Sequence, residues 1–480
     1  MPTLSHHDHD AIIPGLSRAR YIARRLRCIV WLVPCCLSLL SGCQASSHSL
    51  ARATAAFDRG DTAEALEQFG HLAKQRDAEA DILELNRAVV HLLAAKPDAA
   101  VSALETTRRQ LEFLEQIALS EQAHAILDDD SSIAWAGREF ERQMIDNLQV
   151  IASLLQNEDD TFALVSRGME DVWQDQLELQ LPLETQKQPE ITAEAQTLSA
   201  PARHSANRMT AWLAAAVHSE RIQDADVTDR LIQQVAVWDP SGNANAATLQ
   251  TLGTHTASNS GTLQVITLAG RISPWQSERA IPTTAALLVA DRILSLTGKH
   301  TLPPTTSPVL VARPVHKTFS PRYRTHVSVT HQLDQPSCLL VDLNAAAWDS
   351  WQADRDQQLA RAVVRRVVKK ATVYGAKNAL DVSRGSGADM LLNLAGAIWE
   401  SREKADTRQW NLLPAAVEVA QMELPAGQHT VQLVVHSATV ENSSHAVDQL
   451  EIPVMIEDGR NTFVVCFRLQ GKLIGVQSNR

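Results

Sequence analysis

The sequence is poor in several features that define large protein classes. It has 480 residues but only 10 Trp, 8 Phe and 3 Tyr, and its 44 Lys and Arg are outnumbered by 55 Asp and Glu. A nucleic-acid binder needs a basic face or a platform of aromatic rings, so this composition argues against one. Six cysteines are too few for a disulfide scaffold, and 19 Gly and 19 Pro are too few for a collagen-like chain. The length instead fits about three globular domains.

The N-terminus has the organisation of an export signal. The basic segment Arg24–Arg27 precedes Cys28–Leu40, an apolar run that is too short to span the roughly 30 Å of a membrane's hydrocarbon layer. The residues that follow, Leu40-Ser41-Gly42-Cys43, resemble the lipobox of bacterial prolipoproteins. In that motif diacylglycerol is attached to the cysteine sulfur and the chain is cut just before the cysteine. The resemblance predicts a removed signal peptide over residues 1–42 and lipid, palmitate included, on Cys43.

The lipobox also predicts a location. Gln44 stands where an Asp, in enterobacteria-like sorting, holds a lipoprotein in the inner membrane. We therefore expect an outer-membrane lipoprotein that faces the periplasm, bound to the membrane through lipid on Cys43. Only Cys43, Cys338 and Cys466 remain after processing. Cys338 and Cys466 either form a disulfide in the oxidising periplasm or remain buried thiols, because apolar residues flank both.

Residues 43–240 are predicted to form a helical domain built from helix pairs. Ala56–Phe69 resembles the turn and second helix of a tetratricopeptide repeat, with Gly60-Asp61 at the turn and Ala65 where the helices approach. Similar signals follow at Pro97–Leu104, Glu158–Leu164, and Trp212 with Pro240. The phasing predicts a tetratricopeptide-like solenoid with a concave binding surface, and an irregular helical bundle is the alternative. A Gln-rich insert, Gln174–Asn207, is predicted to be flexible in its later part.

The remainder of the chain is predicted to be mixed and then β-rich. Residues 241–345 form a Ser/Thr/Pro-rich segment with short strands, residues 346–410 a helical segment and residues 411–480 a small β-sandwich-like unit. The fold class is therefore α+β. In the last unit two hairpins are expected, with turns at Pro425–Gly427 and Asp458-Gly459. The helical half and the β-rich end are expected to fold separately.

One long helix, from Ala346 to about Leu380, carries many basic residues. Two interpretations are open: a solvated face opposite Leu359, Val363 and Val364, or a contact with anionic lipid or cell wall.

Several segments resemble a family of uncharacterised bacterial lipoproteins. They are Gly137–Arg142, Arg361–Lys370, Ala405–Ala415 and Leu424–Gly427. The resemblance implies a lipobox, tetratricopeptide-like helices and an Asp-x-Arg-x-Trp segment, but no activity. From the residues alone, Asp406 and Arg408 are expected to pair while Trp410 packs where helix gives way to strand. This arrangement is either a structural clasp or an interaction site.

No local motif for catalysis is present in the sequence. It has no zinc-binding HExxH helix, nucleophile elbow, phosphate-binding loop or dinucleotide fingerprint. Ser401–Lys404 matches the S-x-x-K of penicillin-recognising enzymes, but the companion motifs are missing. We therefore expect no catalytic residues, no metal and no cofactor.

These patterns favour a non-enzymatic, lipid-anchored periplasmic scaffold or adaptor. Its helical-repeat groove would bind a protein of the cell envelope. Two alternatives are open: an envelope hydrolase or transferase with a site between the two halves, and a carrier of a small or lipidic ligand. A pocket of several hundred Å³ with convergent polar groups would favour the carrier.

Overall fold

The computed structural model describes most of the chain after the predicted signal. The described residues are 48–76, 79–125, 135–157, 160–180, 205–221, 224–238, 259–296, 307–329, 335–379, 405–438 and 446–480. The predicted signal peptide, Cys43, residues 181–204 of the insert, Pro240 and Ser401–Lys404 lie outside them.

The first half of the described chain is a series of antiparallel helices. After a helix over residues 48–58 come α2 (Thr62–Gln75), α3 (Ala80–Leu93), α4 (Pro97–Ala125), α5 (Glu139–Gln156), α6 (Thr161–Gln180), α8 (Ser205–Ser219) and α9 (Ala225–Val237). The first pair turns at Gly60, which has a positive φ of 78°, and the Asp61 side chain caps α2 by accepting from Glu64 N. Ala65 and Phe69 are fully buried, as expected for the contact between paired helices.

The tetratricopeptide solenoid is not confirmed. A repeat of about 34 residues holds two helices of similar length. Here α3 has 14 residues and α4 has 29, so this pair alone exceeds the period. The insert also begins later than expected, because Gln174–Gln180 continues α6. Successive helices pack against one another, but their lengths do not follow one repeat.

Acid is expected to loosen the contact between α4 and α5. Burial would raise the pKa of Glu105 in α4, but hydrogen bonds from Arg108 and from Gln149 of α5 outweigh it and hold the pKa at about 2. Because the folded pKa lies below the unfolded value of 4.5, this stabilisation is complete above about pH 4.5 and is lost as the pH falls toward 2. Urea unfolding across this range should show a shallower loss of stability in Glu105→Gln than in the wild type. Parallel pH curves for the two proteins would contradict the assignment.

Two larger sheets form the second half. The five-stranded sheet has the order β11-β10-β1-β7-β6, with β1 (Ser260–Ala269), β6 (Cys338–Asp342), β7 (Ala416–Pro425), β10 (Asn461–Leu469) and β11 (Lys472–Ser478). Only β1 and β10 are parallel within it. The four-stranded sheet has the order β5-β4-β8-β9, with β4 (Tyr323–Val329), β5 (Gln335–Pro336), β8 (Gly427–Ser437) and β9 (Ala446–Ile456). Together with the helices, these sheets confirm the α+β class.

The predicted hairpins are instead corners between the two sheets. The turn at Pro425–Gly427 leads from β7 in the five-stranded sheet to β8 in the four-stranded sheet, and the turn at Asp458-Gly459 leads from β9 back to β10. The strands and turns were correctly placed by the sequence, but their pairing was wrong. Neighbouring strands do pair, but the pairs are β8 with β9 and β10 with β11. Alternation and turn residues do not distinguish a hairpin from a corner, because they carry no information on which strand lies alongside.

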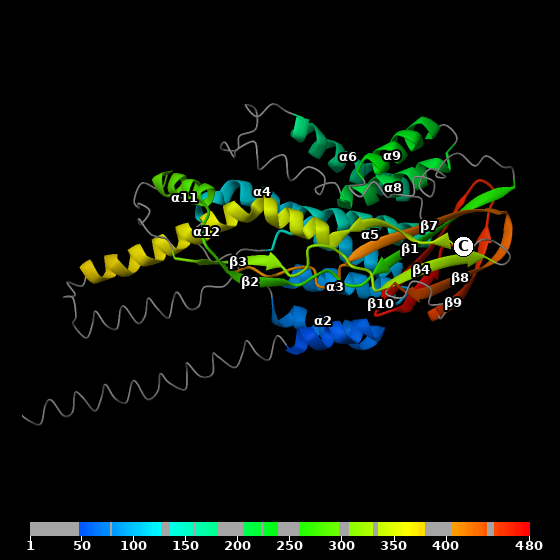
Figure 1. The fold of residues 1–480 in the computed structure, drawn as a ribbon, viewed down its shortest axis with the longest axis horizontal. Helices are drawn as coiled ribbons and strands as arrows, with labels where there is room; N and C mark the ends of the chain where they lie inside the picture. Colours follow the sequence, from blue (N-terminus) through cyan, green and yellow to red (C-terminus); the bar gives the residue numbers. More distant parts are fainter. Residues whose placement is uncertain are drawn as a thin grey trace, which may run out of the picture.

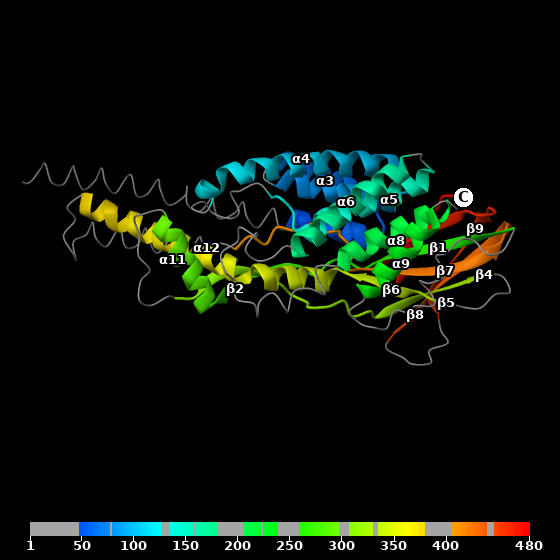
Figure 2. The same ribbon diagram turned by 90° about the horizontal axis from the view of Figure 1, so that it is seen from above.

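The five-stranded sheet is buried on both faces. Along β10, Phe463, Val465 and Phe467 join the core beneath the helices, whereas Val464 and Cys466 join the core between the two sheets. This alternation gives three layers: helices, five-stranded sheet and four-stranded sheet. Figures 1 and 2 show the strands of both sheets gathered at one end of the long axis, next to α8 and α9.

An ion pair is buried between the two sheets. Arg468 of β10 donates to both carboxylate oxygens of Glu418 in β7, at 2.7 and 2.5 Å, and their side chains are only 3% and 6% exposed. Thr325 of β4 accepts from Arg468 at 2.8 Å, and Ser337 donates to Glu418 at 2.7 Å. The pair therefore ties the facing sheets together with its polar atoms satisfied.

The opposite end of the molecule is built around α12 (Leu343–Ala379) (Figure 1). α12 packs with α11 (Thr284–Leu296) and with the two-stranded sheet of β2 (Trp275–Ala280) and β3 (Val309–Pro314). The predicted apolar stripe is confirmed: Leu359, Val363 and Val364 are buried in this third core. Among the basic residues, Arg366 donates to the carbonyls of Ser307 and Pro308 beside β3.

The helices and the sheet share one core. The cluster beneath the helices contains residues of α2–α9 together with residues of β1, β6, β7 and β10. In addition, β1 from the middle segment lies between β7 and β10 from the C-terminal segment. The expected boundaries at residues 240, 345 and 410 thus cross continuous packing. This packing argues against the expectation that the β-rich end folds separately.

Candidate functional site

The segment 405–415 contains the residues expected to form a clasp. The Arg408 guanidinium donates to the Asp406 carboxylate through Nε at 2.9 Å and Nη2 at 2.7 Å. The Arg408 backbone N–H also donates to this carboxylate, at 3.0 Å. This two-pronged contact is the strongest form of an Arg–carboxylate pair. It fixes the chain just before Trp410, whose side chain is fully buried.

Two helices hold the same segment by its backbone. The Glu141 carboxylate of α5 accepts from Trp410 N at 3.0 Å, and the Asn86 side chain of α3 accepts from Leu412 N at 2.9 Å. Glu141 and Asn86 are 1% and 0% exposed. Buried polar side chains of this kind satisfy a backbone that forms no regular secondary structure.

A third contact comes from Arg138, which lies immediately before α5. Its guanidinium donates to the Arg408 carbonyl at 3.2 Å and lies 3.7 Å from the centre of the Trp275 ring. Gly137–Arg142 and Ala405–Ala415, two segments that the sequence singles out separately, therefore meet in space. All these contacts are internal, which favours the structural-clasp interpretation over a binding site formed by Asp406, Arg408 and Trp410.

Removing the Glu141 carboxylate is expected to destabilise the protein. Glu141→Ala leaves the buried Trp410 N–H without an acceptor and removes an acceptor of the Arg138 N–H, which Glu141 binds at 2.9 Å. A buried unsatisfied donor costs about 1–3 kcal/mol. Glu141→Gln keeps one oxygen acceptor, so it should lose less stability than Glu141→Ala. Urea unfolding of both variants tests this, and equal stability of Glu141→Ala and wild type would contradict it.

The clasp also fills the inner side of the helical layer. Trp410, Leu412 and Leu413 are buried in the same core as Phe69 of α2 and Met144 of α5. The side of the helical layer that faces the five-stranded sheet is therefore covered in part by the chain's own segment.

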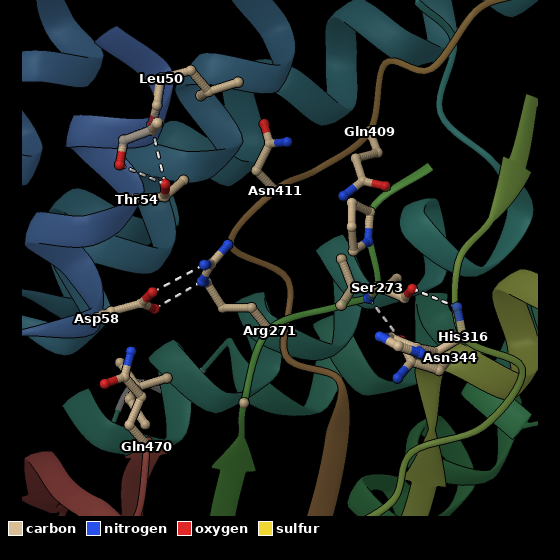
Figure 3. Close-up of a pocket in the computed structure, with 15 residues that line it drawn as sticks. Leu50, Thr54, Asp58, Arg271, Ser273, His316, Asn344, Gln409, Asn411 and Gln470 are labelled. Carbon is tan, nitrogen blue, oxygen red and sulfur yellow. Dashed lines mark hydrogen bonds and ion pairs between the residues drawn. The ribbon is translucent and has the colours of Figure 1, made fainter. Parts of the chain in front are cut away.

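A pocket of about 560 Å³ opens where the N-terminal helix, the β1–β2 loop and the clasp segment meet (Figure 3). Its lining residues are Leu50, Ala51, Thr54, Asp58, Gly270, Arg271, Ile272, Ser273, Pro274, His316, Asn344, Gln409, Asn411, Leu469 and Gln470. This volume is within the range of small-molecule sites, which is about 300–1,000 Å³. We call this cavity the junction pocket.

One wall of the junction pocket is an ion pair. Arg271, just after β1, donates to Asp58 of the N-terminal helix through Nε at 2.7 Å and Nη2 at 2.9 Å. The side chains are 32% and 17% exposed. Figure 3 shows the remaining nitrogen of the guanidinium turned away from Asp58, on the side of Thr54 and Asn411. The pair leaves the wall close to neutral but keeps one Arg271 donor available.

Four carboxamides line the pocket, Asn344, Gln409, Asn411 and the exposed Gln470, and the first three use their oxygens within the protein. Asn344 accepts from Ser273 N at 2.8 Å, Gln409 accepts from Trp275 N at 3.0 Å, and Asn411 accepts from the Asn86 amide at 3.4 Å. Within the described part of the chain, none of the three amide nitrogens has a hydrogen-bond partner. The pocket therefore presents donors whose direction is fixed by the internal contacts of the same side chains.

Sequence reasoning did not identify the junction pocket as a site. Gln409 and Asn411 lie inside the segment that it singled out, but only their neighbours Asp406, Arg408 and Trp410 were chosen. The remaining lining residues come from five separate stretches of chain. A site assembled from single residues so far apart leaves no local spacing for a motif search to detect.

Cys338 and Cys466, the two cysteines among the described residues, are thiols. Cys338 lies in β6 and Cys466 in β10, and the strands β7 and β1 lie between them in the sheet. Three strand spacings correspond to about 14 Å, far beyond the reach of a disulfide. Cys466 is fully buried, and burial raises the pKa of its thiol to about 11. The disulfide alternative is therefore excluded by the structure.

Among the described residues, no group of three or more His, Cys, Asp or Glu side chains is placed to hold a metal ion. No helix in that part of the chain combines the length and the hydropathy needed to cross a membrane. Comparison of the chain with protein-family models, curated proteins and solved structures finds no match. Inference about function therefore depends on the geometry of the clasp and the junction pocket.

Proposed function

We propose that the protein is a non-enzymatic binding protein of the bacterial envelope that holds a small ligand in the junction pocket. The observation that supports it is the set of fixed amide donors on Asn344, Gln409 and Asn411 beside Arg271, which have no partner among the described residues. Donors oriented in advance lose little entropy when they bind a ligand. This favours the ligand-carrier alternative over a scaffold that binds through the inner side of the helices, because residues of segment 405–415 pack against that side.

The same proposal includes anchoring to the outer membrane through lipid on Cys43. The lipobox residues Leu40–Cys43 support it. Covalent geometry adds a constraint, because the chain between Cys43 and residue 48 spans at most about 18 Å when fully extended. Leu50, Ala51 and Thr54 of the helix that starts there line the junction pocket. A lipidated protein would therefore hold this pocket close to the membrane surface.

A role as scaffold remains a second candidate, with a different surface. Phe113 of α4 and Trp173 of α6 are 56% and 55% exposed on the helical layer. Exposed aromatic side chains are typical anchors of protein–protein contacts. A partner protein in the envelope would then bind the outer side of the helices and leave the junction pocket open.

Native mass spectrometry of protein purified from its own envelope tests the proposal. We expect a small molecule bound at one copy per chain in the wild type and its loss in Gln409→Glu. Retention of the same molecule in the variant would place its site elsewhere. Absence of any bound molecule, together with co-purification of a protein that Trp173→Ala abolishes, would replace the carrier proposal with the scaffold.

A further inference from the structure

Four side chains of the junction pocket point hydrogen-bond donors at it while their acceptor oxygens, where they have one, are already engaged. Arg271 Nη1 and the amide nitrogens of Asn344, Gln409 and Asn411 have no partner among the described residues. Gln409 and Asn344 are each only 5% exposed, so their nitrogens can meet little except the pocket itself. A ligand that satisfies them must carry several acceptor oxygens close together.

The charge of the lining limits the kind of oxygen-rich group. Asp58 holds Arg271 by two hydrogen bonds, so the pair contributes almost no net charge, and the other lining residues are neutral apart from His316. A dianion such as free phosphate would meet the Asp58 carboxylate without a second cation to balance it. A singly charged phosphodiester needs only the free donor of Arg271 and the amides.

Part of the remaining lining is apolar and lies beside the predicted anchor. Leu50, Ile272 and Leu469 line the same cavity as the donors, and Leu50 belongs to the helix nearest Cys43. A ligand with a phosphodiester at one end and hydrocarbon at the other matches both parts. We propose, resting on the proposed function, that the junction pocket binds the phosphodiester headgroup of a phospholipid, with the first part of its glycerol backbone against these apolar side chains.

The test uses defined probes and the full chain expressed in cells and purified in a maltoside detergent. Native mass spectrometry measures the binding of dioleoyl phosphatidylethanolamine, of dioleoylglycerol, which lacks the phosphodiester, and of glycerophosphoethanolamine, which lacks the acyl chains. We expect one phospholipid per chain. Binding of dioleoylglycerol should be weaker by at least about tenfold, as expected when a charge-assisted hydrogen bond is lost.

Two variants of equal charge locate the site. Gln409→Glu keeps an oxygen that accepts from Trp275 N but replaces the amide nitrogen with a second carboxylate oxygen. Asn344→Asp likewise keeps the oxygen that accepts from Ser273 N and loses the amide nitrogen. Each should weaken phospholipid binding by about tenfold or more. Gln428→Glu, on an exposed residue of β8, adds the same charge far from the pocket and should bind like the wild type. Thermal unfolding shows whether each variant is folded.

Each outcome decides the proposal. Equal binding of phospholipid and dioleoylglycerol, or unchanged binding in both folded pocket variants, would overturn it. Glycerophosphoethanolamine that binds as tightly as the phospholipid would identify a soluble phosphodiester as the ligand and overturn the lipid assignment. If no probe binds but another molecule co-purifies and is lost in Gln409→Glu, the headgroup inference fails while the proposed function stands.

Discussion

Arg468→Ala is expected to lower the free energy of unfolding by about 3–5 kcal/mol, because it leaves the Glu418 carboxylate buried without its cation. Ser337 would still donate to Glu418, but one neutral hydrogen bond does not replace two from a guanidinium. Urea unfolding followed by circular dichroism measures the loss.

A double variant separates the role of charge from the role of packing. Arg468→Met combined with Glu418→Leu removes both charges and keeps a similar volume. The free energy of unfolding of this double variant should therefore be closer to the wild-type value than that of Arg468→Ala. If the free energy of unfolding of Arg468→Ala lies within about 1 kcal/mol of the wild-type value, the assignment of a buried ion pair is contradicted.

Trp410→Ala is expected to cost about 3–5 kcal/mol, the usual range for deletion of a buried large aromatic side chain. Trp410 is 0% exposed and lies in the core shared by the helices and the five-stranded sheet. Its loss should therefore weaken both layers together. We expect one cooperative unfolding transition at a lower urea concentration.

Trp173→Ala is the matched control. It makes the same chemical change on α6, where the side chain is 55% exposed, and should shift stability by less than about 0.5 kcal/mol. Two separate transitions in Trp410→Ala, with the strands retained after the helices unfold, would contradict the shared core. They would support the expectation that the helical half and the β-rich end fold separately.

The local structure was largely predictable from the sequence. Hydrophobic periodicity identified the helix that begins near Ala346 and its buried stripe through Leu359 and Val363. The turns expected at Pro425–Gly427 and Asp458-Gly459 lie where β7 ends and where β10 is about to begin. These patterns are local, because each arises from the side that one element turns to the core.

The pairing of elements was not predictable in the same way. β1 lies between β7 and β10, which follow it by more than a hundred residues, and the alternation of each strand is the same whichever partner it has. The expected hairpins were wrong for this reason. The unequal lengths of α3 and α4 were likewise not predictable, because the repeat pattern indicated where helices turn and not how long each helix is.

The candidate site was predictable only in part. Asp-x-Arg-x-Trp drew attention to Asp406, Arg408 and Trp410, whose pairing and burial involve residues close in sequence. The pocket residues Arg271 and Asn344 carry no such signal, because their role depends on Asp58 and Ser273.

Hydrogen–deuterium exchange of the full chain, with and without an extract of envelope lipids and metabolites, tests the central claim most directly. Exchange distinguishes protection at the junction pocket from protection on the helical surface, whichever molecule in the extract binds. We predict slower exchange in residues 50–58, 270–275 and 409–411 when the extract is present, and no such change in Gln409→Glu. Protection confined to the exposed sides of α4 and α6, with none around the junction pocket, would contradict the account.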